Sequence, residues 1–425
     1  MKLVCGPLAF AQTADADSMP VVLYDPPHGG RFGSAGHAAR DEIARKRLNP
    51  STHAWDLLSI ALSVVTADFA AQRAQSPDGW TREIQLDIAV SAPDFWRTQQ
   101  QELSAALAFL TTDRWSFRFH GGGDRPPIVN QLIQPEEDCV VLLSGGLDSL
   151  IGTIDLVAGG RRPYAISQVV RGDAEKQMQF AGHIGGGISH MQLNHNAAFD
   201  GDAETSQRAR SFIFLAFGVV AATSLQRYHN GENVPLFICE NGFIAINPPL
   251  TGTRLGSLST RTAHPEFLGR LQNILNAAGL RIQITNPYIL KTKGEMLEEC
   301  MDQAYLANVA AQSTSCGRFQ RFGYRHCGRC IPCQVRRAAF LKWGAAQDTT
   351  GYVYDALGLD NDEHARFDDV RSVAMALSNV QQDGVTSWLG SALSSPRIAD
   401  RAGLQAMLTR GLNELSILHQ QYGVR

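Results

Sequence analysis

Apolar positions at helical and at strand-like spacing alternate through the first part of the chain. Two stretches keep apolar residues on one helical face, and two others alternate apolar with polar residues as half-buried strands do: 55–69, 96–110, 84–90 and 115–119. A linker rich in glycine and proline follows at 121–127. The pattern predicts an N-terminal α+β accessory domain over residues 1–135.

The pattern changes in residues 136–345. Short apolar runs are separated there by helical patterns: 139–143, 163–170, 188–193 and 234–239. This order is typical of a parallel sheet with helices on both faces, so we expect a doubly wound α/β domain. Residues 346–425 end in a stripe of leucines from Leu404 to Leu418 at helical spacing, which predicts a helical C-terminal region.

Composition narrows the class of protein. The chain has 38 Lys and Arg against 41 Asp and Glu, a net charge of -3, which argues against a basic nucleic-acid-binding protein. Its 44% of hydrophobic residues exclude bulk disorder, and there is no internal repeat. The apolar run 212–222 is shorter than the ~20 residues of a membrane span. The start of the chain resembles a signal sequence, but Gly6-Pro7 interrupts it, so we expect a cytoplasmic protein.

One loop carries the strongest chemical signal. An apolar strand runs into Ser144, Gly145, Gly146, Leu147, Asp148 and Ser149, here called the phosphate loop. Adjacent glycines let backbone N–H groups approach an anion, and a helix that starts at this point directs its positive end to the same place. Ser144 and Ser149 add hydroxyl donors, and Asp148 would hold Mg²⁺ or cap the helix.

The phosphate loop lacks the lysine pattern of GTPase P-loops. It resembles the PP-loop of ATP pyrophosphatases, which cleave ATP between the α and β phosphates. An ordinary strand–turn–helix is the structural alternative. In a doubly wound fold ATP lies beyond the carboxyl ends of the strands, so Val170 and Arg171, which end the second strand, are candidate ATP contacts.

Four of the eight cysteines lie close together in the sequence. Cys316, Cys327, Cys330 and Cys333 fall within 18 residues, a spacing typical of metal ligands in a reducing compartment. Four thiolates suit a structural Zn²⁺ site. An iron–sulfur cluster is the main alternative, and free thiols or a disulfide are the others.

The motifs together resemble the 7-cyano-7-deazaguanine synthase (QueC) family. The matching segments span about half of the chain: 144–149, 209–215, 264–267, 292–295 and 327–336. The resemblance implies ATP-dependent activation of a 7-deazaguanine carboxylate, with the phosphate loop and Arg210 binding ATP. It further implies that Asp148 and Lys293 are catalytic and that the four cysteines hold zinc.

The chain also departs from the synthase pattern. Ser211 follows Arg210 where the synthases usually have Asn, and the loop after the fourth strand starts with Glu240 and Asn241. Both are candidate substrate contacts, although Asn241 is also typical of a turn before Gly242. About 135 residues precede the family core and about 85 follow it. This layout resembles the QueC-like proteins of bacterial anti-phage operons, the QatC type, and implies partner proteins encoded in the same operon.

Three classes of function remain open on the sequence. The first is an enzyme that transfers the activated deazaguanine acyl group to an amine, on a partner protein or, alternatively, on ammonia to give the free nitrile. The second is a PP-loop enzyme that modifies tRNA, against which the net charge of -3 argues. The third is a non-catalytic nucleotide sensor, against which the intact phosphate loop and Lys293 argue.

Overall fold

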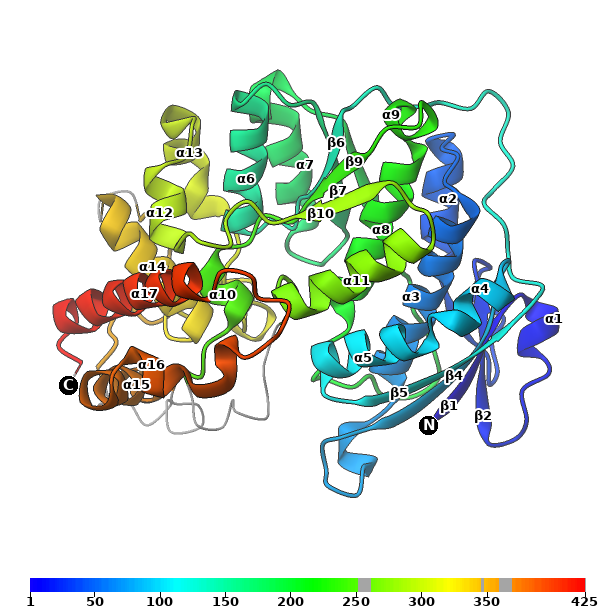
Figure 1. Cartoon of the computed structure of the whole chain (residues 1–425), viewed down its shortest axis with the longest axis horizontal. Coiled ribbons are helices and arrows are strands. Elements are labelled where there is room, and N and C mark those ends of the chain that lie inside the picture. The colour runs from blue at the N-terminus through cyan, green and yellow to red at the C-terminus, as the bar shows by residue number, and fades with distance from the viewer. Residues whose placement is uncertain (251–260, 345–347, 359–368, 425) are drawn as a thin grey trace.

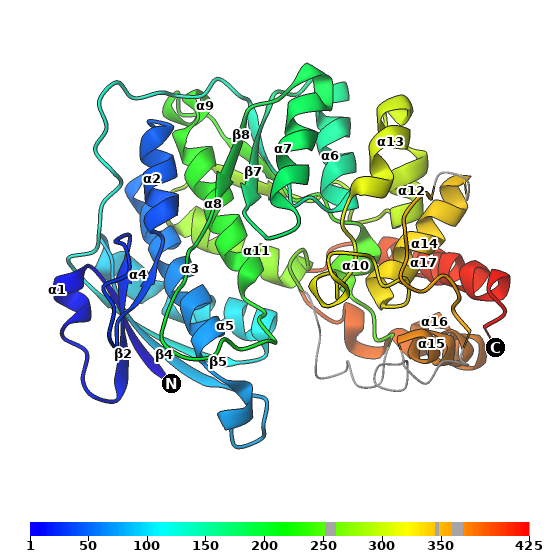
Figure 2. The same cartoon turned by 180° about the vertical axis from the view of Figure 1, so that it is seen from behind.

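The computed structural model describes residues 1–250, 261–344, 348–358 and 369–424. They form two five-stranded sheets, with helices between the sheets and a helical region beside the second sheet (Figures 1 and 2). Every pairing between neighbouring strands is parallel. The fold class is therefore α/β, as the pattern of residues 136–345 predicts.

The first sheet lies entirely within the N-terminal region. Its strands, in the order β3-β2-β1-β4-β5, are β1 Lys2–Gly6, β2 Ser18–Leu23, β3 Gly33–Ala35, β4 Glu83–Ala89 and β5 Arg114–His120. The expected α+β arrangement of residues 1–135 is corrected to α/β, because these strands are all parallel. The outer face of β5 is exposed, so its apolar and polar residues alternate in a way more typical of an antiparallel sheet.

The second sheet has the order β10-β9-β6-β7-β8. Its strands are β6 Cys139–Leu142, β7 Pro163–Gln168, β8 His190–Leu193, β9 Val234–Phe237 and β10 Ile282–Thr285. The sequence predicts the first four, and β10 was missed. Alternate residues of β6 face separate hydrophobic cores on the two sides, Val140 in one and Val141 in the other, as a doubly wound sheet requires.

Both sheets share one strand order. Numbered from its own first strand, each sheet reads 3-2-1-4-5. Helices α3 (Thr52–Ala70) and α8 (Arg210–Ser224) each connect the third strand of a sheet to the fourth, and they pack on each other. Helices α5 (Gln100–Thr111) and α11 (Pro265–Ala277) each connect the fourth strand to the fifth, and they pack together too. The topology thus recurs without a sequence repeat.

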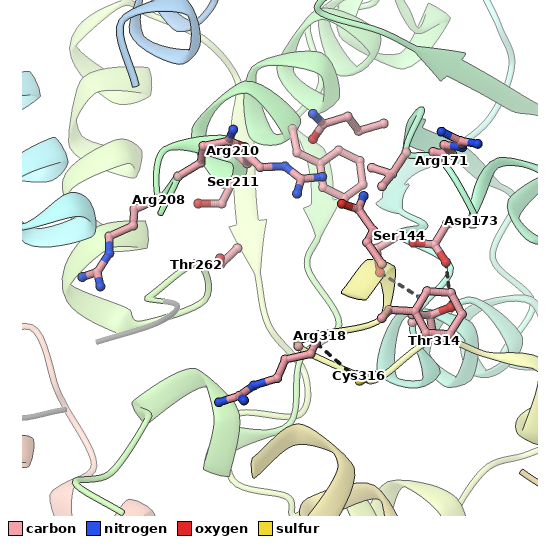
Figure 3. Close-up of a pocket in the computed structure, with 18 of the residues that line it drawn as sticks. Ser144, Arg171, Asp173, Arg208, Arg210, Ser211, Thr262, Thr314, Cys316 and Arg318 are labelled. Carbon is pink, nitrogen blue, oxygen red and sulfur yellow. Dashed lines mark hydrogen bonds between the residues drawn. The ribbon is translucent and has the colours of Figure 1, made fainter. Parts of the chain in front are cut away.

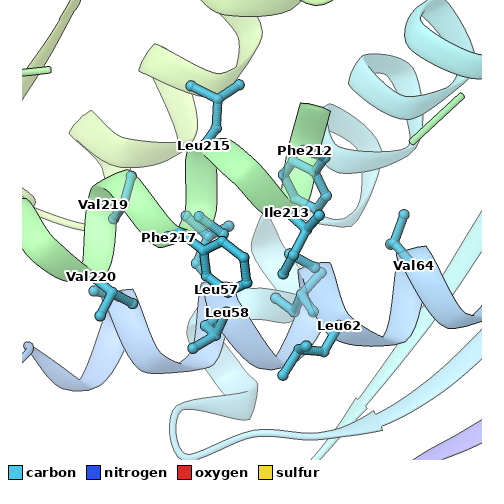
Figure 4. Close-up of a cluster of buried hydrophobic side chains, with 14 of the residues drawn as sticks. Leu57, Leu58, Leu62, Val64, Phe212, Ile213, Leu215, Phe217, Val219 and Val220 are labelled. Carbon is cyan, nitrogen blue, oxygen red and sulfur yellow. The ribbon is translucent and has the colours of Figure 1, made fainter. Parts of the chain in front are cut away.

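The contact between α3 and α8 is apolar. Leu57, Leu58 and Leu62 of α3 lie against side chains of α8, among them Ile213 and Phe217 (Figure 4). Almost every residue of α3 is buried, because the first sheet covers one side of the helix and α8 another. One hydrophobic core therefore contains residues from both sides of position 135.

The remaining α-helices have between 4 and 21 residues. They are α1 Leu8–Ala11, α2 His37–Arg45, α4 Pro93–Thr98, α6 Leu147–Ala158, α7 Ala174–His183, α9 Gln226–His229, α10 Gly242–Ile246, α12 Lys293–Glu298, α13 Gln303–Val309, α14 Ile331–Gly344, α15 Asp369–Asp383, α16 Val385–Leu389 and α17 Arg401–Gln421. None of the helices in the described ranges has the length and apolar character needed to cross a bilayer.

The C-terminal leucine stripe lies on α17. Leu404 and Leu418 mark its ends, and both are buried in a core shared with α10 and α14. The helical prediction for this region is confirmed where the structure describes it. The predicted boundary between residues 345 and 346 lies outside the described residues, and the three-domain division stays a prediction.

Candidate functional site

The phosphate loop connects β6 to α6 in a tight turn. The backbone N–H of Ser144 donates to the hydroxyl of Ser149 at 3.1 Å, and that of Gly146 donates to the Ser144 hydroxyl at 3.2 Å. Gly145 has a φ of +87°, which favours glycine. No side chain of the described residues caps α6, so the first N–H groups of this 12-residue helix are available to an anion.

A cavity of about 1130 Å³ lies over this loop. Its walls come from the end of β7, the start of α8, the segment 203–208 and the segment 314–321 (Figure 3). Among the predicted site residues, eight line it: Ser144, Gly146, Ser149, Val170, Arg171, Arg210, Glu240 and Cys316. The volume exceeds the ~300–1,000 Å³ usual for a single small ligand, so there is room for a nucleotide and a second reactant.

Arginines give the cavity a positive character. Arg210 extends into it on the side of Ser144, whereas Arg208 extends in the opposite direction (Figure 3). Burial lowers the pKa of Arg210, and no ion pair to it occurs within the described part of the chain. Arg208 stacks on the ring of Trp80 at 4.6 Å, and burial lowers its pKa to about 10. Both cations thus sit in partly desolvated positions where an anion would stabilise them.

Asp148 and Lys293 form a buried ion pair behind the loop. Asp148 also accepts from the side chain of Asn241 at 2.6 Å and from its backbone N–H at 3.2 Å. Burial alone would raise the pKa of Asp148, but the Lys293 charge and these hydrogen bonds outweigh it and lower the pKa. The structure brings together three predicted site residues, although none of the three lines the cavity.

Local structure fixes each partner of this pair. Asp148 is in the first turn of α6 and Lys293 is the first residue of α12, which Thr292 caps together with Glu295. Asn241 caps α10 by accepting from the N–H of Ile244 at 3.1 Å. The catalytic roles of Asp148 and Lys293, the Mg²⁺ role of Asp148 and the substrate role of Asn241 stay predictions.

Glu240 lies in the loop that follows the carboxyl end of β9 and lines the cavity. Burial and then the charge of Asp148 raise the pKa of Glu240 to about 8, against the opposing effect of Lys293. The side chain of Asn286 holds the Glu240 backbone from both sides, donating to its carbonyl at 2.9 Å and accepting from its N–H at 3.4 Å. Its position is consistent with the predicted substrate contact, which stays a prediction.

The four predicted metal ligands come together in a closed cluster. The sulfur atoms of Cys316, Cys327, Cys330 and Cys333 lie within 4.8 Å of one another, and all four side chains are buried. Two of the separations are 3.9 Å (Cys316 to Cys330) and 3.8 Å (Cys327 to Cys333). Four sulfurs at ~2.3 Å around one tetrahedral Zn²⁺ would be about 3.8 Å apart.

Backbone groups support the same geometry. The N–H groups of Arg318 and Cys327 donate to the Cys316 sulfur at 3.4 Å, and that of Cys330 donates to the Cys327 sulfur at 3.3 Å. Gly328 has a φ of +87°, and a Cβ there would lie 2.3 Å from the Tyr354 carbonyl. The cluster can therefore bind a metal such as zinc, and the short sulfur separations favour one ion over a multi-iron cluster.

The cysteine cluster is attached directly to the phosphate loop. The backbone N–H of Thr314 donates to the Gly145 carbonyl at 3.0 Å, and its hydroxyl donates to Asp173 at 2.6 Å. Fully buried Arg336 donates to the Ser313 carbonyl at 3.2 Å. A metal that fixes Cys316 would therefore also fix one wall of the cavity.

The N-terminal region holds the opposite wall. Buried Asp68, near the end of α3, accepts from the backbone N–H groups of Arg208 and Ala209 at 2.7 and 2.8 Å. Glu204 accepts from the N–H of Arg73 at 2.8 Å. No local sequence motif contains Asp68, Asp173, Arg208 or Thr314, because each acts across more than a hundred residues or through the backbone.

Comparison with known proteins agrees with this geometry. The family described as "Queuosine biosynthesis protein QueC" matches residues 262–344, which include β10, Lys293 and the four cysteines. A "7-cyano-7-deazaguanine synthase" of Geobacter sp. (strain M21) is 25% identical over 236 residues, covering 49% of this chain and 95% of that protein. A second, of Marinomonas sp. (strain MWYL1), is 24% identical over 233 residues with the same coverage of 49% and 95%. The chain is thus QueC-like in sequence, which supports an enzyme of the ATP pyrophosphatase and ligase type.

Proposed function

We propose that this protein uses ATP to activate the carboxylate of a 7-deazaguanine, releases AMP and pyrophosphate, and transfers the acyl group to an amine on a partner protein. One observation carries the proposal. In this QueC-like chain, the phosphate loop lines a cavity of about 1130 Å³, and no side chain caps the start of α6 that follows the loop. A large acceptor needs an open, spacious site, and ammonia does not. The layout of the sequence, similar to the QatC type, supports a role in anti-phage defence with partners from the same operon.

The geometry suits the first chemical step. The ATP phosphates would lie on the N–H groups of the phosphate loop and the start of α6, with Arg210 and Arg171 on the cavity wall. Mg²⁺ would balance the phosphate charge. A carboxylate oxygen of the deazaguanine attacks the α-phosphorus, the bond to the bridging oxygen of the β-phosphate breaks, and pyrophosphate leaves. Fixed cations near the developing charge stabilise this transition state.

In the second step an amine nitrogen attacks the acyl carbon and AMP leaves. The nitrogen loses one proton, and an amide results. With ammonia as acceptor, a second ATP would remove the amide oxygen and give the free nitrile. The names of both relatives favour this alternative product.

Mass spectrometry separates the two products. The protein is incubated with ATP, Mg²⁺, 7-carboxy-7-deazaguanine and either ammonium or a protein from the same operon. We expect AMP together with a protein that gains the mass of one acyl group. Free nitrile with an unmodified partner protein would contradict the transfer and identify a synthase. A salt-dependent gel shift with tRNA would favour the RNA-modifying class instead.

A further inference from the structure

Among the described residues, arginines outnumber carboxyl groups on the walls of the cavity. Five arginines line it: Arg171, Arg208, Arg210, Arg318 and Arg321. Three carboxyl groups also line it, and each is already bonded within the chain: Asp173, Glu204 and Glu240. The cavity therefore offers positive charge that its own carboxyl groups do not balance, although the whole chain has a net charge of -3.

Arg208 is turned away from the phosphate loop. Its side chain extends from the cavity wall in the direction opposite to Ser144 (Figure 3), and its guanidinium stacks on the ring of Trp80 at 4.6 Å. Asp68 accepts from its backbone N–H at 2.7 Å, so the N-terminal region fixes both ends of the residue. An anion bound at Arg208 would therefore occupy a part of the cavity separate from the phosphate loop.

The charge of Arg208 has no partner in the described part of the chain. Its Nη1 atom is buried without an acceptor, and no carboxylate of those residues forms an ion pair with it. Asp68 and Asp113, the carboxylates whose charges act on it, both pair with Arg82 instead. Burial lowers the pKa of Arg208 and of nearby Arg261 to about 10. A desolvated cation without a counter-charge is unfavourable, so the protein would gain stability from an anionic ligand at this point.

The other anions of the proposed reaction have their places elsewhere. The ATP phosphates would lie on the phosphate loop, and the carboxylate of the deazaguanine must meet the α-phosphorus there. The acceptor protein is the reactant left for the opposite part of the cavity. A guanidinium binds a carboxylate through two parallel hydrogen bonds, so the side chain of an aspartate or glutamate matches Arg208 in charge and in shape.

We propose that Arg208 binds a carboxylate side chain of the acceptor protein, a few residues after the N-terminal amine that receives the acyl group. This inference rests on the proposed function and defines the acceptor as a chain with an acidic N-terminal segment. The amine reaches the acyl carbon beside the phosphate loop while the carboxylate holds the chain at Arg208. An extended chain advances ~3.3–3.6 Å per residue, so the preferred position of the acidic residue measures the span between the two points.

Short peptides test the proposal on the unaltered protein. Each consists of six glycine and serine residues with a free N-terminus, and one Glu or one Gln replaces residue 2, 3, 4, 5 or 6. Amide formation is measured with ATP, Mg²⁺ and 7-carboxy-7-deazaguanine at increasing peptide concentration. At one position or two adjacent ones, we expect Glu to lower the KM for the peptide by ~10–100-fold relative to Gln, the range of a charge-assisted hydrogen bond, with kcat changed less.

Arginine variants separate this contact from a structural role. Arg208→Gln should remove the preference for Glu, while exchange of labelled pyrophosphate into ATP, which reports adenylation, stays within a few-fold of wild type. Arg208→Lys keeps the charge but loses the paired hydrogen bonds, so part of the preference should remain. Arg118→Gln makes the same change at an exposed residue of β5 that does not line the cavity, and should behave as wild type. A thermal melt checks that each variant folds.

Each outcome decides the matter. Equal KM values for the Glu and Gln peptides at every position would overturn the proposal, and so would a preference for Glu that survives in Arg208→Gln. An equal loss of pyrophosphate exchange in Arg208→Gln would place this arginine at the nucleotide and overturn it as well. No exchange in the wild-type protein would instead overturn the proposed function, on which this inference depends, and would be seen before any peptide is compared.

Discussion

The two sheets have one strand order and different contents at their carboxyl edges. After β6 the chain turns through Ser144, Gly145 and Gly146 into a 12-residue helix whose start is uncapped. β1, the equivalent strand, ends at Gly6, and Pro7 leads directly into a helix of four residues. A short helix that follows proline offers little positive potential to an anion. Of these two equivalent loops, only the one after β6 leads into the uncapped start of a long helix.

At the corresponding edge of the first sheet, a side chain of α3 bonds to the segment that follows β4. Buried Asp56 of α3 accepts from the N–H groups of Ser91 and Ala92 at 2.7 and 3.0 Å, and from the indole of Trp96 at 3.0 Å. In the second sheet Asp148 occupies the first turn of α6, and a large cavity adjoins its loop. Strand order thus provides an edge where ligands can bind, and the loop residues decide whether one does.

The first sheet instead has a supporting task. Its helix α3 packs along α8, and Asp68 holds the start of α8 beside the cavity. Substitutions or metal removal beside the second sheet should therefore abolish AMP formation directly. Substitutions beside the first sheet should reduce it by shifting Arg208 and Arg210.

Metal removal should have the largest effect on the second sheet. Stripping the ion from Cys316, Cys327, Cys330 and Cys333 frees the segment that joins Thr314 to the phosphate loop. We expect a clear fall in melting temperature and loss of AMP formation, both restored by Zn²⁺. Elemental analysis should find one zinc per chain. A chain that holds no metal as purified and is fully active would contradict this role.

Asp148→Ala should rank next. It leaves the buried Lys293 ammonium without a partner, which costs about 3–5 kcal/mol of unfolding free energy. Urea unfolding measures the loss, and AMP formation should cease. Because the pKa of Asp148 is lowered, the wild-type protein should keep this contribution at pH values above the ordinary 3.8 and lose it only as the pH falls below that value. A variant as stable as wild type would show that the pair is not formed.

Asp68→Asn tests the supporting role of the first sheet. The amide keeps the shape but removes a charge from the ion pair with Arg82 and from the acceptor of the Arg208 and Ala209 N–H groups. We expect a loss of about 1–3 kcal/mol and a raised KM for ATP with kcat reduced less. Asp94→Asn, whose carboxylate is exposed, is the matched control. An unchanged KM would separate the first sheet from the site.

Glu414→Gln should have the smallest effect. Glu414 of α17 contacts Thr292, which caps α12 just before Lys293, and lies 3.2 Å from Lys342. Losing its charge should cost about 0.5–1.5 kcal/mol and lower AMP formation only a few-fold. A thermal melt run beside a kinetic assay checks both. A loss as large as that of Asp148→Ala would place the C-terminal helix in the catalytic machinery.

Local patterns in the sequence predicted much of the second sheet. They predicted few of the contacts that join the region of the first sheet to the region of the second. The loop at 144–149 and the cysteine cluster are compact motifs, and β6 and β9 lie in short runs of mostly apolar residues. By contrast β10 alternates apolar and polar residues over four positions, and β3 consists of three small residues, so neither forms an apolar run. The pairing of Asp148 with Lys293, and of Asp68 with the start of α8, depends on contacts across more than a hundred residues, which spacing alone does not encode.

The most direct test of the account asks whether the phosphate loop of the second sheet drives adenylation of a deazaguanine acid. AMP and pyrophosphate are measured for the wild-type protein with ATP and Mg²⁺, with and without 7-carboxy-7-deazaguanine, beside a Ser144→Ala variant. The account predicts AMP only when the acid is present, and far less of it from the variant. AMP at the same low level in all three reactions would contradict the account.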